Sequence, residues 1–253
     1  MDDKKSASSP NVIWMFGDQH RAQALSVMED PNVQTPNIDR LAVSSRTGIA
    51  GSPLCSPFRG SLLTSQYPHR CIPGHDIALP DGMPTVATAF GHNDYQTAYI
   101  GKWHVDGATH RPSDTRPAFQ YVNPNRRGDF DYWISYENNN SQYDCWVHGH
   151  HEDGAPIKSY QLRGYETDAL TDLLIEYLRN RSLDQPFFVA LSVQPPHSPY
   201  VAPPEFMERH RPETIQLRPN VPKVNRVQKQ ARQSLAGYYA MIENLDWNVG
   251  RIL

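Results

Sequence analysis

The sequence predicts an α/β fold, a doubly wound and mostly parallel sheet with helices on both faces. Three short apolar runs, at residues 11–16, 97–100 and 187–193, have the length and character of buried strands. Helical patterns alternate with these runs along the chain, as is typical of layered α/β folds. The predicted helices cover residues 35–42, 57–64, 84–92, 165–179 and 237–253.

Polar side chains follow each predicted strand at its carboxyl end. Asp18 comes after the first strand, Lys102 and His104 come after the second, and His197 lies in a proline-rich turn after the third. Ligands of open α/β sheets bind outside the carboxyl ends of the strands. Three strands that each carry such a cluster therefore predict one shared site.

A fourth cluster lies at the start of a predicted helix. Pro57 opens this helix, and either Cys55 or Ser56 can cap it. The helix dipole and the free backbone N–H groups favour negative charge at this end. Arg59 lies one turn after Cys55 on the same helix face. This arrangement would lower the pKa of a thiol, and it would equally receive a dianionic ester.

The remaining segments set the expected domain limits. Residues 1–10 are polar and are expected to form a disordered leader. Residues 48–54 are expected to form a small strand or a connector. The aromatic, Asn-rich stretch 105–160 is expected to be an irregular insertion that shapes a pocket rim. Residues 11–253 otherwise predict one continuous α/β unit.

Composition excludes several classes of protein. A net charge of −3 over 253 residues does not favour nucleic acid or an anionic membrane as a partner. No apolar run reaches the roughly 20 residues of a membrane helix, so no membrane span is expected. The polar start lacks the core of a secretory signal, which predicts a cytoplasmic protein. Three cysteines are too few and odd in number for a disulfide framework.

The segment Cys55-Ser56-Pro57-Phe58-Arg59, followed by Gly60-Ser61-Leu62-Leu63-Thr64, resembles the signature of the type I sulfatases, which belong to the alkaline phosphatase-like superfamily. In that family the cysteine is oxidised to formylglycine. Further segments resemble the family in the same order along the chain. They are Asn11 to Asp18, Thr35 to Ala42, Gly101 to His104, Pro196 to Pro199 and Tyr239 to Ile252.

The resemblance implies a divalent metal, usually calcium, with Mn²⁺, Mg²⁺ or Zn²⁺ as alternatives. Its ligands would be Asp18, Gln19 and the formylglycine at Cys55, and oxygen donors suit a hard cation. Gln19 stands where the family more often has a second aspartate. That departure resembles the phosphonate monoester hydrolase and choline sulfatase branches, and it leaves the metal's identity open.

The resemblance also implies catalytic roles. Hydrated formylglycine at Cys55 would attack sulfur with the help of Arg59, and the second hydroxyl would later expel the sulfate. Lys102 would neutralise the sulfate and the leaving oxygen, and His104 would bond or deprotonate the diol. Because strand residues two apart project to one side, Lys102 and His104 are expected to point together. His197 would bind sulfate and protonate the leaving alcohol.

Two further histidine groups have less defined roles. His75 and the adjacent Asp76 fall where related enzymes place a substrate-contacting side chain. His148, His150 and His151 invite a zinc interpretation, but the surrounding segment favours an exposed loop and no site is predicted there.

These expectations add up to a sulfuric ester hydrolase acting on a sulfate monoester, with a carbohydrate sulfate as one candidate. The implied partners are a small-molecule or saccharide sulfate and a formylglycine-generating maturation enzyme. The family's Asp-Asn-Gly or Asp-His-Gly block has no match in 1–253. We therefore expect only the N-terminal portion of the fold, with its C-terminal part missing, a half-built metal site and little activity from this chain alone.

Three alternatives remain open at this point. A phosphonate monoester or phosphodiester hydrolase would use the same formylglycine. A thiol hydrolase would use Cys55 unmodified. A non-catalytic fragment or interaction module would retain only the first half of the fold.

Overall fold

The structure, a computed structural model, describes residues 9–42, 50–108 and 116–253. The expected leader at 1–10 and the connector at 48–54 lie partly outside these ranges. A six-stranded mixed sheet occupies the centre in the order β1-β6-β2-β3-β4-β5. The first four strands of this order run parallel, and the last two pairings are antiparallel. The strands are β1 Val12–Gly17, β2 Gln96–Lys102, β3 Tyr132–Tyr136, β4 Trp146–His150, β5 Pro156–Gln161 and β6 Phe187–Val193.

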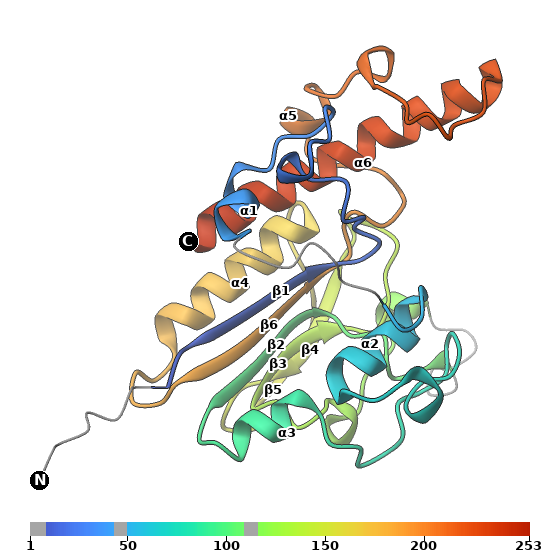
Figure 1. Cartoon of the computed structure of the whole chain (residues 1–253). Coiled ribbons are helices and arrows are strands. Elements are labelled where there is room, and N and C mark those ends of the chain that lie inside the picture. The colour runs from blue at the N-terminus through green and yellow to red at the C-terminus, as the bar shows by residue number, and fades with distance from the viewer. Residues whose placement is uncertain (1–8, 43–49, 109–115) are drawn as a thin grey trace, which may run out of the picture.

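Helices cover both faces of the sheet, with α4 and α6 on one side and α2 and α3 on the other (Figure 1). The side chains of β6 alternate between the two faces of the sheet, which explains why both faces are covered. Val189 and Leu191 pack in the core that includes Leu170 of α4, whereas Phe188 and Ala190 pack in the opposite core. The predicted doubly wound, mostly parallel α/β fold is confirmed. The helices are α1 Pro36–Leu41, α2 Cys55–Thr64, α3 Val86–Gly91, α4 Glu166–Asn180, α5 Pro204–Met207 and α6 Asn225–Ile252.

Two segments differ from expectation. Strands β3 and β4 lie inside 105–160 and β5 begins there, although this stretch is expected to be irregular. Helix α6 begins at Asn225 rather than Gly237. Its added first turns are mostly polar, so the sequence pattern does not mark them. Short 3₁₀ helices lie at Ser26–Met28, Pro68–Arg70, Pro117–Phe119, Pro124–Arg126 and Pro212–Thr214. Within the described residues, every helix is too short or too polar to cross a bilayer.

Close backbone approach aligns the strands that carry the site. Parallel pairing sets Gly101 of β2 opposite Ser192 of β6. Gly101 has a φ of +103°, and a Cβ there would collide with the Ser192 carbonyl oxygen. A Cβ on Gly17 would lie 2.6 Å from the Pro195 carbonyl oxygen. Glycine at both positions therefore lets the carboxyl ends of β1, β6 and β2 meet.

Candidate active site

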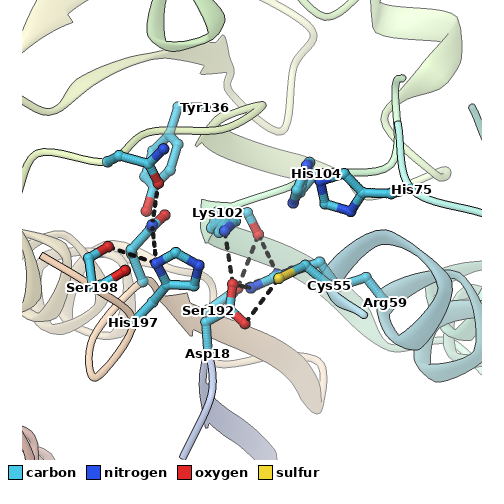
Figure 2. Close-up of polar contacts among 12 residues, drawn as sticks. Asp18, Cys55, Arg59, His75, Lys102, His104, Tyr136, Ser192, His197 and Ser198 are labelled. Atoms are coloured by element: carbon cyan, nitrogen blue, oxygen red, sulfur yellow. Dashed lines mark hydrogen bonds and ion pairs between the residues drawn. The ribbon is translucent and has the colours of Figure 1, made fainter. Parts of the chain in front are cut away.

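The centre of the site is a buried carboxylate between two cations. Asp18 follows β1 and is 8% exposed. The Lys102 ammonium Nζ donates to Asp18 Oδ2 at 2.7 Å, and Arg59 Nη2 lies 3.6 Å from the same oxygen (Figure 2). Three segments distant in sequence thus meet at one carboxylate, as predicted from the ends of the strands and the start of α2. Buried charges of this kind are tolerated only when paired.

The protonation states of the charged groups in this cluster are set by the groups around them. Burial raises the pKa of Asp18, but Arg59 and Lys102 outweigh it and hold that pKa well below its usual range. Burial lowers the pKa of Lys102, and the attraction of Asp18 opposes this change. Asp18 is therefore ionised across the neutral pH range.

Cys55 contacts the same carboxylate. It is the first residue of α2, with Leu54 rather than Cys55 or Ser56 at the N-cap position. The thiol donates to Asp18 Oδ1 at 3.3 Å. Burial and the negative charge of Asp18 raise the pKa of this thiol. The expected lowering is therefore wrong, because these two effects exceed the help of the helix amino end, Lys102 and Arg59.

A network of hydrogen bonds at the end of β2 holds the two cations, Lys102 and Arg59, in place. The Lys102 carbonyl oxygen accepts from Tyr99 Oη at 2.6 Å, Ser192 Oγ at 2.9 Å and Arg59 Nη1 at 2.8 Å. Arg59 Nη1 also donates to Ser192 Oγ at 2.7 Å. Tyr99 and Ser192 are not among the residues that the sequence predicts for the site. The available signal is Ser192 itself, a lone hydroxyl in the otherwise apolar strand β6.

His104 lies beside this cluster but turns to other neighbours. It is 3% exposed, and its φ of +54° breaks the strand alternation that predicts a shared direction with Lys102. Its Nε2 lies 3.7 Å from Asp76 Oδ1, and its ring packs edge-on to His75 with centroids 5.3 Å apart. Burial first, then Lys102 and Arg59, lower the pKa of His104 to about 2. Within the described residues, both ring nitrogens lack a hydrogen-bond partner.

His197 lies on the loop after β6, which contains two cis prolines, Pro196 and Pro199. Its Nδ1 donates to the Ser198 carbonyl oxygen at 2.6 Å and lies 3.3 Å from Gln194 Nε2. Figure 2 shows Asp18 between His197 and Cys55. In the part of the chain that the structure describes, no hydrogen bond or ion pair joins His197 to Asp18.

Glu166, at the start of α4, anchors this loop. It is fully buried, and its Oε1 accepts from Tyr136 Oη at 2.5 Å and from the Gln194 backbone N–H at 2.9 Å. Burial raises the pKa of Glu166 to about 7. The Glu166 backbone N–H donates to the Gln142 carbonyl, and the Gln142 side chain donates to the Pro199 carbonyl at 2.9 Å. No sequence signal identifies Glu166, because an acidic residue is ordinary in a first helical turn.

The residues present do not complete a calcium site. Asp18 supplies one carboxylate, and its two oxygens already face Lys102, Arg59 and Cys55. The predicted ligand Gln19 is exposed, has a φ of +61°, and makes no described side-chain contact with Asp18. Calcium takes roughly six to eight oxygen ligands. This donor set does not fit that ion, and no step proposed below passes through a metal.

The histidines of β4 are part of the sheet rather than an exposed loop. His148 is buried, and its Nε2 accepts from the Val122 backbone N–H at 3.0 Å. His150 Nδ1 lies 2.7 Å from Arg127 Nη1, and its Nε2 donates to the Phe130 carbonyl at 3.0 Å. The loop expectation is wrong here because strand pairing with β3 encloses these side chains.

Comparison with known proteins agrees with this architecture. The sulfatase family model matches residues 10–253. The ulvan-active sulfatase of Formosa agariphila is 33% identical over 262 aligned positions, covering 100% of this chain and 48% of the relative. The N-acetylglucosamine-6-O-sulfatase of Bacteroides thetaiotaomicron is 28% identical, covering 81% of this chain and 34% of that protein. The yidJ sulfatase structure from Bacteroides fragilis superposes with a TM-score of 0.85 at 26% identity, covering 100% of this chain and 59% of that one.

The chain belongs to the sulfatase family, within the alkaline phosphatase-like fold. It spans about half the length of the ulvan-active relative. The resemblance in the sequence, with its restriction to an N-terminal portion of the family, is therefore confirmed.

Proposed function

We propose that the protein hydrolyses a sulfate monoester and that Cys55 is converted to formylglycine for this reaction. The observation that carries the proposal is the environment of Cys55. Its thiol lies at a helix amino end beside two buried cations, yet Asp18 and burial raise its pKa. An unmodified thiol there stays protonated and is a weak nucleophile. This favours formylglycine over a thiol hydrolase.

The side chains near Cys55 would have separate roles in the reaction. Formylglycine, when formed, supplies a hydroxyl nucleophile through its hydrate. Lys102 and Arg59 place two positive charges where a sulfate's negative charge would develop. His104 is neutral, and with a pKa of about 2 its ring can hydrogen-bond the diol but not deprotonate it. His197 faces the site from the loop after β6 and would deliver a proton to the leaving alcohol.

A saccharide sulfate is the proposed substrate class. The support is the printed activity of relatives, an ulvan-active sulfatase and an N-acetylglucosamine-6-O-sulfatase. His75 is exposed beside His104 and can contact the alcohol portion of such an ester. The chain spans about half the length of the ulvan-active relative, so these assignments are proposals about the activity of the whole protein.

Two measurements test the proposal. The first is peptide mass spectrometry across Cys55 on protein isolated from its native cell, where we expect an aldehyde in place of the thiol. The second compares that protein on sulfated saccharides, aryl sulfates and aryl phosphonate monoesters, with a Cys55→Ala variant as control. An intact thiol in active protein would refute the formylglycine assignment. A faster, Cys55-dependent phosphonate reaction would favour the phosphonate hydrolase alternative.

A further inference from the structure

A second cluster of metal-ligating side chains lies next to the site, separate from Asp18. It consists of His75, Asp76 and His104, whose ligand atoms all lie within 4.8 Å of one another. Asp76 Oδ1 is 3.7 Å from His75 Nε2 and also 3.7 Å from His104 Nε2. One carboxylate oxygen is thus equally distant from two imidazole nitrogens. Figure 2 shows the rings of His75 and His104 next to each other.

Buried His104 is the observation that points to a ligand. It is 3% exposed, and neither ring nitrogen has a partner within the described residues. Leaving a buried polar atom unpaired is unfavourable. A group that approaches between His104 and Asp76 would satisfy this nitrogen.

The two segments that carry the cluster are fixed against each other by the backbone. The Ala108 backbone N–H donates to the Asp76 carbonyl at 3.0 Å, and the Leu79 N–H donates to the Val105 carbonyl at 2.8 Å. Gly107 has a φ of +75°, and a Cβ there would lie 2.6 Å from the Ala78 nitrogen. Only glycine permits this approach. The cluster is therefore held in place before any ligand binds.

Two residues of the cluster have an unusual backbone conformation. Asp76 and His104, the two residues that face each other, both adopt positive φ, +57° and +54°. Left-handed conformations of non-glycine residues are unfavourable and concentrate at ligand sites. Here they turn the carboxylate and the imidazole toward one point.

We propose that His75, Asp76 and His104 form a site for a borderline transition-metal cation, Zn²⁺ in particular. Two imidazole nitrogens and one carboxylate oxygen are a common zinc ligand set with one open position. Zinc bonds of roughly 2.0–2.1 Å place two tetrahedral ligands about 3.3 Å apart. The two 3.7 Å separations need to close by only a few tenths of an ångström. Calcium and magnesium prefer all-oxygen shells and would bind here weakly.

The charges around the site have opposite effects on the cation. The positive charges of Lys102 and Arg59 repel it. Asp18 balances one of these charges, and Asp76 supplies a negative charge directly to the ion. The proposal concerns binding alone and does not rest on the proposed function.

The test is Zn²⁺ titration of the 253-residue chain against a chromogenic chelator. We expect one saturable Zn²⁺ per chain, unaffected by a large excess of Ca²⁺ or Mg²⁺. His75→Ala and Asp76→Asn should each weaken binding at least about tenfold, since even the loss of a group that orients a ligand typically costs about 10–100-fold. Asparagine also tolerates the left-handed conformation of Asp76, so the second variant should fold. His92→Ala, an exposed histidine at the end of α3, is the matched control and should bind unchanged.

Cys55 is the competing ligand, because its thiolate could hold zinc together with His104. Cys55→Ser should keep the wild-type affinity, and X-ray absorption should show nitrogen and oxygen neighbours without sulfur. Loss of binding in Cys55→Ser or a sulfur neighbour would overturn the proposal. So would an absence of saturable binding, or equal affinity in His75→Ala, Asp76→Asn and wild type.

Discussion

Lys102 and Asp18 form a 2.7 Å ion pair in which the side chains are only 1% and 9% exposed. The pair joins the end of β2 to the end of β1, although β6 lies between these strands in the sheet. It therefore closes the carboxyl edge of the sheet over the strand that carries Ser192. Its removal tests both the stability of this edge and the charge balance of the site.

Lys102→Ala should destabilise the chain by about 3 kcal/mol, since breaking a buried pair leaves an uncompensated charge. Arg59, 3.6 Å from Asp18, keeps the loss at the lower end of the usual range. Urea denaturation measures the change. Lys158→Ala, on the exposed side of β5, should stay within about 0.5 kcal/mol of wild type. Equal effects of the two variants would show that the ion pair adds no stability.

Asp18→Asn should make the Cys55 thiol more reactive in protein made without maturation. The aspartate charge raises the thiol pKa, so its removal lowers that pKa and increases the thiolate fraction at neutral pH. The alkylation rate of the Cys55 peptide, followed by mass spectrometry between pH 7 and 9, checks this. Buried Cys71 and Cys145 in the same protein serve as internal controls. A slower reaction at Cys55 in the variant would contradict the assigned electrostatics.

Calcium should not stabilise the 253-residue chain. Ligand binding to the folded state raises stability only when the ligand concentration exceeds Kd. The described residues offer one carboxylate at Asp18, already matched by Lys102 and Arg59. We therefore expect the urea midpoint to be the same with millimolar Ca²⁺ and with a chelator. A clear upward shift that Asp18→Asn abolishes would mean that the donor set is sufficient after all.

The fold was predictable because its signals are local. Apolar runs mark β1, β2 and β6, and the polar residues that follow them meet because parallel neighbours end at one edge. The same logic predicts the meeting of Asp18, Lys102 and Cys55. Strands β3 to β5 were missed because β4 carries histidines and β5 is an exposed edge strand with almost no apolar alternation.

The interactions that tune the site were less predictable. Whether a helix amino end lowers the pKa of Cys55 depends on the distance to Asp18, which is 37 residues away in the chain. Glu166 and Gln194 meet only through the packing of α4 against β6. Local sequence patterns do not contain such separations, so the meeting of Asp18, Cys55 and Lys102 could be predicted but not its electrostatics.

Glu166 should make the stability of the chain fall as pH rises. Its pKa is about 7 in the folded protein and near 4.5 when unfolded, so between these values only the folded state holds the proton. Stability is then lost from about pH 4.5 to about pH 7, by about 3 kcal/mol in total. Glu166→Gln keeps the acceptor for Tyr136 and Gln194 but removes the titration.

The measurement is urea denaturation of wild type and Glu166→Gln at pH 5 and pH 8. His104 opposes this trend, since its lowered pKa favours the folded state as pH rises, but it does so in both proteins. Glu137, also with a pKa raised to about 7 by burial, contributes equally to both. The difference between the two proteins therefore isolates Glu166. A difference that is unchanged between pH 5 and pH 8 would refute the raised pKa.

Gly101→Ala should disrupt the edge of the sheet at which the site is assembled. The new Cβ would collide with the Ser192 carbonyl oxygen, and alanine would have to adopt a φ of +103°. We expect a loss of more than about 3 kcal/mol, or no folding, because strain and a backbone clash act together. Gly91→Ala is the control, since nothing lies within 4 Å of its added Cβ. It should leave the urea midpoint unchanged or raise it slightly, as alanine favours helix.

Because Gly101 immediately precedes Lys102, a partly folded Gly101→Ala protein should also lose the shielding of the Cys55 thiol, with faster alkylation. Unchanged stability together with slow alkylation of Cys55 would contradict this prediction. It would mean that β2 and β6 can move apart to admit the new Cβ without opening the site.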